Sequence, residues 1–144
     1  SLGNGLTHRI GLYDGVLVKD NHLEALDYDF ENAVDLAKNG SKYVEIEVEN
    51  ERHALDAAKA IKNISKKTKN LFAIMLDNIK PKEIRAIVKE LRKKGLYDYV
   101  LLEASGSINP SNFIGYGDCG VDVISMGCIT NSAKVLNMSE EIEK

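Results

Sequence analysis

Three glutamates stand at alternate positions in one short segment of the chain. Because side chains alternate between the two faces of a β-strand, the carboxylates of Glu45, Glu47 and Glu49 share one face. Two interpretations are open at this point. The segment is an edge strand with a solvated acidic face, or its acidic face lines a binding site and is stabilised by a metal ion or by cations such as Lys19. The two interpretations predict different burial of the carboxylates.

Another carboxylate, that of Asp77, directly follows the apolar run 72–76. Taken by itself, an aspartate at this position indicates an Asx-turn with Asn78, and this turn would cap a helix beginning at Pro81. Paired with Glu47 on the neighbouring strand, it predicts a site for a ribose hydroxyl or a hydrated Mg²⁺ ion, because both favour carboxylate oxygens.

Two turns made of small residues, 105–107 and 127–130, each lie between a predicted strand and a predicted helix. Backbone N–H groups exposed in such turns, together with the partial positive charge of a helix N-terminus, are able to bind a phosphate. Glycines at these positions also serve simply as turn residues.

Cationic and donor side chains gather around the first predicted strand. His8 and Arg9 precede it, and Lys19 stands at its end. An arginine binds a carboxylate with two hydrogen bonds, and a lysine adds a point charge. The group therefore indicates a local anion site in a chain that is acidic overall.

The positions of these residues depend on the elements that carry them. Short apolar or β-branched runs predict strands at 16–19, 43–48, 71–76, 99–102 and 121–125. Apolar residues at helical spacing, with capping and stop signals, predict helices at 30–37, 55–64, 81–94 and 110–117, and a last helix beyond Thr130. Strands that alternate with helices imply βαβ units and a parallel sheet.

We interpret residues 1–144 as a single α/β unit of about five βα steps. A closed eight-stranded barrel typically needs about 250 residues, so the unit is an incomplete, open TIM-like barrel or an open sheet. In both architectures, ligands bind beyond the carboxyl ends of the strands. Lys19, Asp77 and the two small-residue turns lie at those ends.

Composition excludes several other classes of function. Lys and Arg number 19 against 22 Asp and Glu, which gives a net charge of -3, so the chain has no overall basic field for nucleic acid. It contains neither a signal segment nor an apolar run of roughly 18 residues. We therefore predict a cytoplasmic protein with neither a nucleic-acid nor a membrane partner.

Six segments, taken in order, resemble the carboxyl-terminal barrel portion of the quinolinate phosphoribosyltransferases, also called carboxylating nicotinate-nucleotide pyrophosphorylases. The segments are GLTHRIGLYD (5–14), LVKDNH (17–22), EIEVEN (45–50), MLDN (75–78), LEASG (102–106) and GVDVISMG (120–127). The resemblance implies phosphoribosyl transfer from phosphoribosyl pyrophosphate to quinolinate with Mg²⁺. The products are nicotinate mononucleotide, carbon dioxide and pyrophosphate, in a step of NAD biosynthesis.

The same resemblance implies roles for individual residues. His8, Arg9 and Lys19 hold the two carboxylates of quinolinate. Glu47 and Asp77 face the ribose and are the candidate protein ligands of the metal ion, and together with Lys19 they are the catalytic residues.

For the 5′-phosphate, the resemblance implies binding by Ser105, Gly106 and Gly127. Asn131 stands where the family usually has histidine, and its side chain can still donate a hydrogen bond to substrate. The resemblance further implies a homo-oligomer, an amino-terminal α/β sandwich domain, and an Arg-Lys pair on a preceding strand. Because this chain lacks that domain and that pair, we expect weak or no turnover from the 144 residues alone.

Two alternative functions are open from the sequence. A nicotinate phosphoribosyltransferase-like enzyme shares the barrel but holds only one substrate carboxylate. A non-catalytic α/β-barrel fragment serves assembly or ligand binding. The presence of both Arg9 and Lys19 favours quinolinate over nicotinate, because two cations match two carboxylates.

Overall fold

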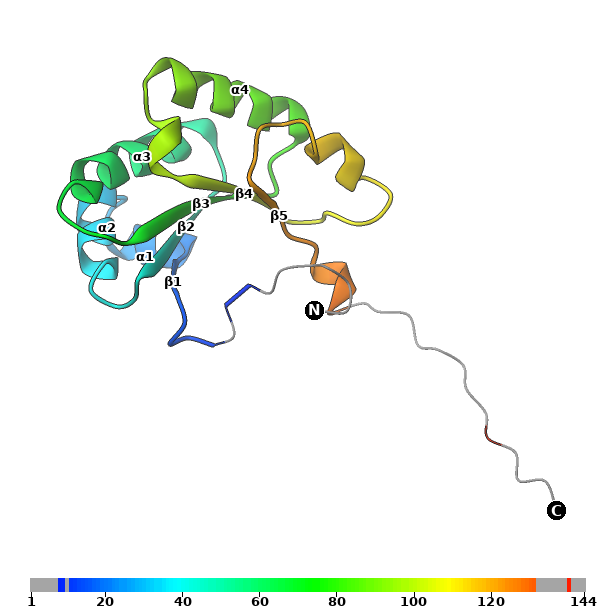
Figure 1. Ribbon diagram of the computed structural model, residues 1–144, viewed down its shortest axis with the longest axis horizontal. Coiled ribbons are helices and arrows are strands. Elements are labelled where there is room, and N and C mark those ends of the chain that lie inside the picture. The colour runs from blue at the N-terminus through cyan, green and yellow to red at the C-terminus, as the bar shows by residue number, and fades with distance from the viewer. Residues whose placement is uncertain (1–7, 10, 132–139, 141–144) are drawn as a thin grey trace.

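The computed structural model describes residues 8, 9, 11–131 and 140, and its centre is one parallel β-sheet (Figure 1). The strands of this sheet are β1 (Val16–Val18), β2 (Tyr43–Val48), β3 (Leu71–Asp77), β4 (Leu101–Ser105) and β5 (Val123–Ile124). The connecting helices and 3-10 turns are α1 (Asp20–Ala25), α2 (Phe30–Ala37), α3 (Glu51–Ser65), α4 (Pro81–Lys93), η1 (Tyr97–Tyr99), η2 (Phe113–Tyr116) and η3 (Gly127–Ile129). The predicted α/β fold is confirmed.

The strand order decides between the two α/β architectures. Each strand pairs with the next one along the chain, and every pair is parallel. A doubly wound sheet reverses its strand order at a switch point, whereas a barrel keeps the chain order. The helices α2, α3 and α4 also lie together on one side of the sheet (Figure 1). The described part of the chain is therefore an open portion of a TIM-like barrel.

The two faces of the sheet differ in chemistry. The face toward the helices is buried and apolar, and in the three central strands it consists of Val44, Ile46, Val48, Phe72, Ile74, Leu76, Leu102 and Ala104. By the strand register, the opposite face carries Glu45 and Glu47 of β2, Asp77 of β3, and Glu103 and Ser105 of β4. Full burial of one large aliphatic side chain contributes about 1.5–3 kcal/mol. The apolar face therefore stabilises the fold, and the polar face carries the chemistry.

Local caps position the two longest helices. The side chain of Asn50 accepts a hydrogen bond from the backbone N–H of His53 at 2.9 Å and begins α3. Pro81 occupies the first turn of α4, where it costs no hydrogen bond, and the Glu83 side chain accepts from the backbone N–H of Lys80 at 3.2 Å. The buried stripe of α4 consists of Ile84, Ile87, Val88 and Leu91.

Two strand predictions were displaced. The fourth strand covers Leu101–Ser105 rather than 99–102, because residues 97–99 form the 3-10 turn η1. This shift moves Glu103 from the end of the strand into the strand itself. The fifth strand is reduced to Val123–Ile124. Just before it, Asp122 bonds to Leu102 twice: its backbone N–H donates to the carbonyl oxygen of Leu102, and its side chain accepts from the N–H of Leu102.

The helix predictions need three corrections. The second predicted helix, 55–64, begins earlier, at Glu51, because Asn50 caps it. The predicted helix 110–117 is only the 3-10 turn η2. The short helix α1 was not predicted, because Leu23 is its one buried residue and so gives no apolar repeat. The helix expected beyond Thr130 falls largely on residues 132–139 and 141–144, which lie outside the described residues.

Candidate active site

The carboxyl ends of three neighbouring strands bring together Lys19, Glu47 and Asp77. Lys19 directly follows β1, Glu47 lies one residue before the end of β2, and Asp77 ends β3. Burial raises the pKa of Glu47, the charge of Lys19 lowers it, and the charge of Asp77 raises it. The three groups are therefore within electrostatic reach of one another. An ammonium group beside two carboxylates is able to bind a ligand that carries both anionic and hydroxyl groups.

The acidic alternation in β2 faces a site rather than bulk solvent. Because β2 pairs with β1 on one side and β3 on the other, the edge-strand interpretation is wrong. The Glu45 side chain is 0% exposed, Glu47 is partly buried and Glu49 is exposed. The strand therefore runs from the interior of the barrel portion to its rim.

A second buried carboxylate, that of Glu103 on β4, lies beside Glu45. The pKa of Glu103 is raised to about 7, mainly by burial. The hydrogen bond with Ser125 acts to lower this pKa, and the charge of Glu45 acts to raise it. Burial and the charges of the two glutamates also raise the pKa of Tyr43. Among the described residues, Oε1 of Glu45 and Oε1 of Glu103 have no hydrogen-bond partner. The interior of the polar face is thus strongly acidic.

The structure separates the three cationic residues that were predicted to act together. His8 lies over the interior, with its Nε2 atom 2.7 Å from Oε2 of Glu45. Arg9 donates a hydrogen bond from Nη1 to the carbonyl oxygen of Gly15 at 3.1 Å, at the amino-terminal end of β1. Lys19 lies at the opposite end of that strand. The joint role of these residues stays a prediction.

The turn after β4 is built around a close backbone approach. Gly106 has a φ of +86°, and a Cβ atom placed there would lie 2.5 Å from Oδ1 of Asn78. The N–H of Asn78 donates to the carbonyl oxygen of Ser105 at 2.9 Å, and the hydroxyl of Ser107 donates to Oδ1 of Asn78 at 3.2 Å. The turn therefore requires glycine, and it places Ser105 in register with Asp77 of β3.

Asp77 does not cap α4, so the capping prediction is wrong. The residue at the N-cap position is Lys80. Asp77 instead accepts a hydrogen bond from the side-chain amide of Asn78 at 2.6 Å. Its carboxylate therefore stays at the rim of the sheet, beside the end of β4.

The second small-residue turn brings Gly127 and Asn131 together. The carbonyl oxygen of Gly127 accepts hydrogen bonds from the N–H of Asn131 at 2.8 Å and from the hydroxyl of Thr130 at 3.1 Å. Gly127 begins the 3-10 turn η3, which follows β5 after Ser125 and Met126. Both residues are exposed at the carboxyl edge of the sheet, where the site predictions place a phosphate.

A sequence model of the quinolinate phosphoribosyl transferase C-terminal domain matches residues 1–141 of the chain. The chain belongs to this family. The match covers all the predicted site residues, from His8 to Asn131. The resemblance seen in the six sequence segments is thereby confirmed.

Individual relatives of this transferase domain support the same assignment. The chain is 42% identical over 144 residues to a probable carboxylating nicotinate-nucleotide pyrophosphorylase of Methanothermobacter thermautotrophicus, covering 98% of this chain and 48% of the relative. It is 33% identical over 141 residues to the human carboxylating nicotinate-nucleotide pyrophosphorylase, covering 96% of this chain and 43% of the relative. The chain thus spans about half the length of the curated relatives that it matches.

Two solved structures match the fold. The nicotinate-nucleotide pyrophosphorylase of Francisella tularensis superposes with a TM-score of 0.69 at 34% identity, over 95% of this chain and 44% of that chain. NadC of Streptococcus pyogenes superposes with a TM-score of 0.75 at 29% identity, over 94% and 44% of the two chains. The open sheet of the transferase domain is therefore the architecture of these proteins over the matched part.

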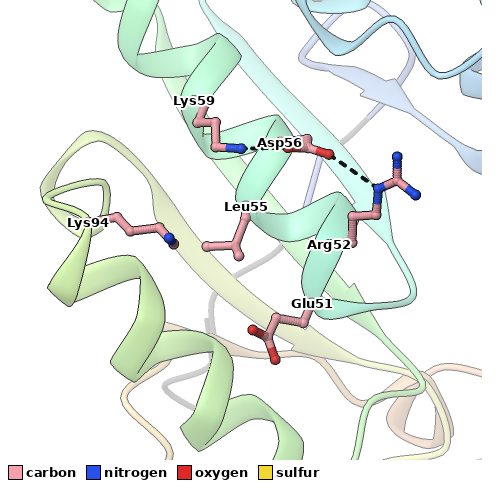
Figure 2. A pocket seen from close by; sticks show the side chains of 6 residues that line it. All are labelled: Glu51, Arg52, Leu55, Asp56, Lys59 and Lys94. Carbon is pink, nitrogen blue, oxygen red and sulfur yellow. Dashed lines mark hydrogen bonds and ion pairs between the residues drawn. The ribbon is translucent and has the colours of Figure 1, made fainter.

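A surface hollow of the domain lies away from these residues. It sits between α3 and α4 and is lined by Glu51, Arg52, Leu55, Asp56, Lys59 and Lys94 (Figure 2). Asp56 pairs with Lys59 at 2.8 Å and with Arg52 at 3.9 Å. The lining is an exposed network of helix charges, and such pairs contribute little. None of the predicted site residues takes part in it.

Two residues of the acidic interior, Glu45 and Glu103, were absent from the predicted site of the transferase domain. The alternation with Glu47 placed Glu45 on the correct face, but it did not show which glutamate is buried. Glu103 lay just beyond the predicted strand 99–102, so it was not expected inside the sheet. A signal for it was available, because a lone carboxylate inside the apolar run 101–104 is costly unless it faces a partner.

Proposed function

We propose that the protein carrying this chain transfers a phosphoribosyl group from phosphoribosyl pyrophosphate to quinolinate and removes one carboxylate as carbon dioxide. The products are nicotinate mononucleotide, carbon dioxide and pyrophosphate, and the reaction belongs to NAD biosynthesis. The observation that carries the proposal is the grouping of Lys19, Glu47 and Asp77 at one edge of the sheet. The family and the names of the relatives support it.

Quinolinate is a dianion, and the cationic residues of the domain would hold it. His8 and Lys19 would each take a carboxylate at the polar face, and Arg9 would contribute its guanidinium once substrate competes with Gly15 for it. Bidentate pairing makes an arginine especially suited to a carboxylate. These roles rest on the charges and on the family resemblance.

Transfer breaks the bond between C1 of the ribose and the pyrophosphate and forms a bond from C1 to the ring nitrogen of quinolinate. The electron pair of the breaking bond leaves with pyrophosphate, so positive charge develops on the ribose. Carboxylates held at fixed strand ends, those of Glu47 and Asp77, would stabilise this charge. Decarboxylation then breaks the bond between ring carbon C2 and the carboxylate carbon. The positive charge of the adjacent quaternary nitrogen stabilises the electron pair left on C2, and C2 takes up a proton from solvent to give nicotinate mononucleotide.

Mg²⁺ fits the donor set of this edge. Glu47 and Asp77 offer only oxygen ligands, which Mg²⁺ prefers, and the like charge of Asp77 acting on Glu47 shows that the two carboxylates share one region. We propose that these two residues would hold the ion through water. When bound, Mg²⁺ supplies neutralising charge for pyrophosphate as it leaves.

The 5′-phosphate would bind at the two small-residue turns of the domain. Ser105 and Gly106 offer a hydroxyl and a backbone N–H at the end of β4, and Gly127 with Asn131 offers further donors after β5. Adjacent strand ends meet at one edge, so both turns serve one ligand.

Assembly and location complete the proposal. We propose a homo-oligomer in the cytoplasm. No helix in the described part of the chain is long and apolar enough to cross a membrane. The cytoplasmic location, the oligomer and the division of residues 1–144 into one domain stay predictions.

Product formation tests the proposed reaction. The chain is incubated, alone and joined to an amino-terminal half as found in its longer relatives, with quinolinate, phosphoribosyl pyrophosphate and Mg²⁺. We expect nicotinate mononucleotide and carbon dioxide in equal amounts from the longer form and little from the chain alone. Absence of product from both forms would refute the proposal. Product from nicotinate without carbon dioxide would favour the single-carboxylate alternative.

A further inference from the structure

The imidazole of His8 is anchored at one of its two nitrogens. Its Nε2 atom lies 2.7 Å from Oε2 of Glu45, and its Nδ1 atom has no hydrogen-bond partner among the described residues. The His8 side chain is 38% exposed, whereas that of Glu45 is 0% exposed. A half-exposed ring is thus held by a fully buried carboxylate.

This contact fixes which ring atom faces a ligand. An ionised carboxylate only accepts hydrogen bonds, so we assign the hydrogen of this contact to Nε2. Turning the ring over would place a C–H group against a buried carboxylate and leave that oxygen unpartnered, which is costly. Nδ1 is therefore the atom left for substrate, and in the protonated ring it donates a hydrogen bond to a carboxylate.

The anchor itself is rigid. Glu45 lies on β2, which is paired on both sides, and its partner in register on β3 is Ala73. Glu103 of β4 is in register with Met75 of β3, so it lies diagonally across the sheet from Glu45. One oxygen of each glutamate and a ring nitrogen of His8 all lie within 4.8 Å of one another. Groups held on strands are placed more precisely than groups on loops. His8 lies before the first strand, so the contact with Glu45 is what ties its ring to the sheet.

Among the groups around Glu45 in the described part of the chain, His8 is the hydrogen-bonding base. Tyr43 on the same strand and Glu103 on β4 act on this region, and both are acids. Oε1 of Glu45 has no hydrogen-bond partner among the residues that the structure describes. Loss of Glu45 would therefore free the ring of His8 from the sheet.

We propose that Glu45 is a positioning residue for substrate recognition, which holds His8 through Nε2 and so presents Nδ1 to one carboxylate of a pyridine dicarboxylate. This inference rests on the proposed function, which supplies the substrate class. Glu45 acts only through His8 and does not touch the substrate.

Binding measurements on four forms of the protein test the role. Titration calorimetry is performed with quinolinate and with phosphoribosyl pyrophosphate on the wild type, Glu45→Ala, Glu45→Gln and Glu49→Gln, in the form that binds both ligands. We expect Glu45→Ala to weaken quinolinate binding about tenfold, the scale of one lost charged hydrogen bond. Phosphoribosyl pyrophosphate binding should stay within about twofold. Glu45→Gln should retain most of the affinity for quinolinate, because its amide oxygen still accepts a hydrogen bond from Nε2. Glu49→Gln, at an exposed position of the same acidic segment, is the matched control.

A double-mutant cycle separates positioning from general damage. If Glu45 acts through His8, then Glu45→Gln and Glu45→Ala add no further loss in a His8→Ala background. Additive losses, or equal weakening of both ligands, would overturn the proposal. Stoichiometric binding of Zn²⁺ or Mn²⁺ that is lost in both Glu45→Gln and Glu103→Gln would also overturn it, because the cluster would then be a cation site.

The ring tautomer provides a readout that needs no substrate. Two-bond ¹H–¹⁵N spectra of the chain should show hydrogen on Nε2 of His8 in the wild type and a mixture of tautomers in Glu45→Ala. An unchanged spectrum overturns the positioning role alone. Absence of quinolinate binding by the wild-type protein overturns the proposed function, and with it the substrate, while the tautomer result stands separately.

Discussion

Glu47 and Asp77 carry like charges on neighbouring strands, and the charge of Asp77 raises the pKa of Glu47. A fold gains nothing from placing two carboxylates together, so such pairs are typical of sites that bind a cation or a developing positive charge. Lys19 acts on the same group in the opposite direction. This edge of the sheet thus carries one ammonium group and two carboxyl groups, which suit a ligand that has both negatively and positively charged parts.

The pKa of Glu47 should respond to each neighbour with a defined sign. Asp77→Asn removes a repelling charge and should lower the pKa of Glu47, whereas Lys19→Ala removes an attracting charge and should raise it. The measurement is a ¹³C titration of the Glu47 carboxyl carbon by NMR. Asp20→Asn should lower the pKa less than Asp77→Asn does, because Asp20 acts on Glu47 more weakly. No change in Asp77→Asn would contradict the arrangement.

Lys19→Ala should also change ligand affinity selectively. An ammonium group at the end of β1 is proposed to bind quinolinate, so the substitution should weaken quinolinate binding by about tenfold or more and phosphoribosyl pyrophosphate binding much less. Separate calorimetric titrations of the two ligands measure this. Lys42→Ala, which removes an exposed lysine before β2, should leave both affinities unchanged. Equal losses for both ligands in Lys19→Ala would exclude the assigned role.

Gly106→Ala should destabilise the domain and damage the turn after β4. The added Cβ atom would lie 2.5 Å from Oδ1 of Asn78, and the φ of +86° is unfavourable for alanine. We expect a loss of about 1–3 kcal/mol in the free energy of unfolding, together with weaker binding of phosphoribosyl pyrophosphate, measured by urea denaturation and calorimetry. Gly117→Ala is the control, because φ there is -61° and the nearest atom to an added Cβ is 3.5 Å away. Equal stability of the two variants would show that the turn tolerates a side chain.

The sequence was sufficient to predict the strands and helices whose residue patterns are periodic along the chain. Strands β2 and β3 and helix α4 were predicted closely, because β-branched runs and the spacing of Ile84, Ile87 and Leu91 are local signals. Helix α1 was missed because its one buried residue gives no period. The distinction between a barrel portion and a doubly wound sheet depends on strand order, which no local pattern contains.

For the candidate site, the residue types were predictable and their environments were not. Alternation placed Glu45 and Glu47 on one face, yet only the pairing of β2 on both sides shows that Glu45 is buried. Arg9 was predicted to lie with Lys19 from sequence proximity to one strand. Its guanidinium instead binds the carbonyl oxygen of Gly15, at the other end of β1. Such choices between competing partners are made by tertiary geometry.

Glu103 should make the stability of the domain decrease as the pH rises. Its pKa in the folded chain is raised to about 7, above the value of about 4.3 for an unfolded glutamate. Between these two values the folded state keeps a proton that the unfolded state has released. The contribution of Glu103 to the free energy of unfolding is therefore fully present below about pH 4, falls as the pH rises toward 7, and is lost above that.

Thermal unfolding of the wild type and of Glu103→Gln across pH 5 to 8 isolates this effect. Glutamine cannot titrate and matches the shape of the protonated acid, so the variant should gain stability relative to the wild type as the pH rises, with the smallest difference at pH 5, where only part of the contribution of Glu103 is lost. The difference between the two proteins cancels the opposite contributions of exposed carboxylates, which are common to both. A difference that stays constant over this range would mean that Glu103 is ionised throughout, and a cation must then accompany it in the barrel interior.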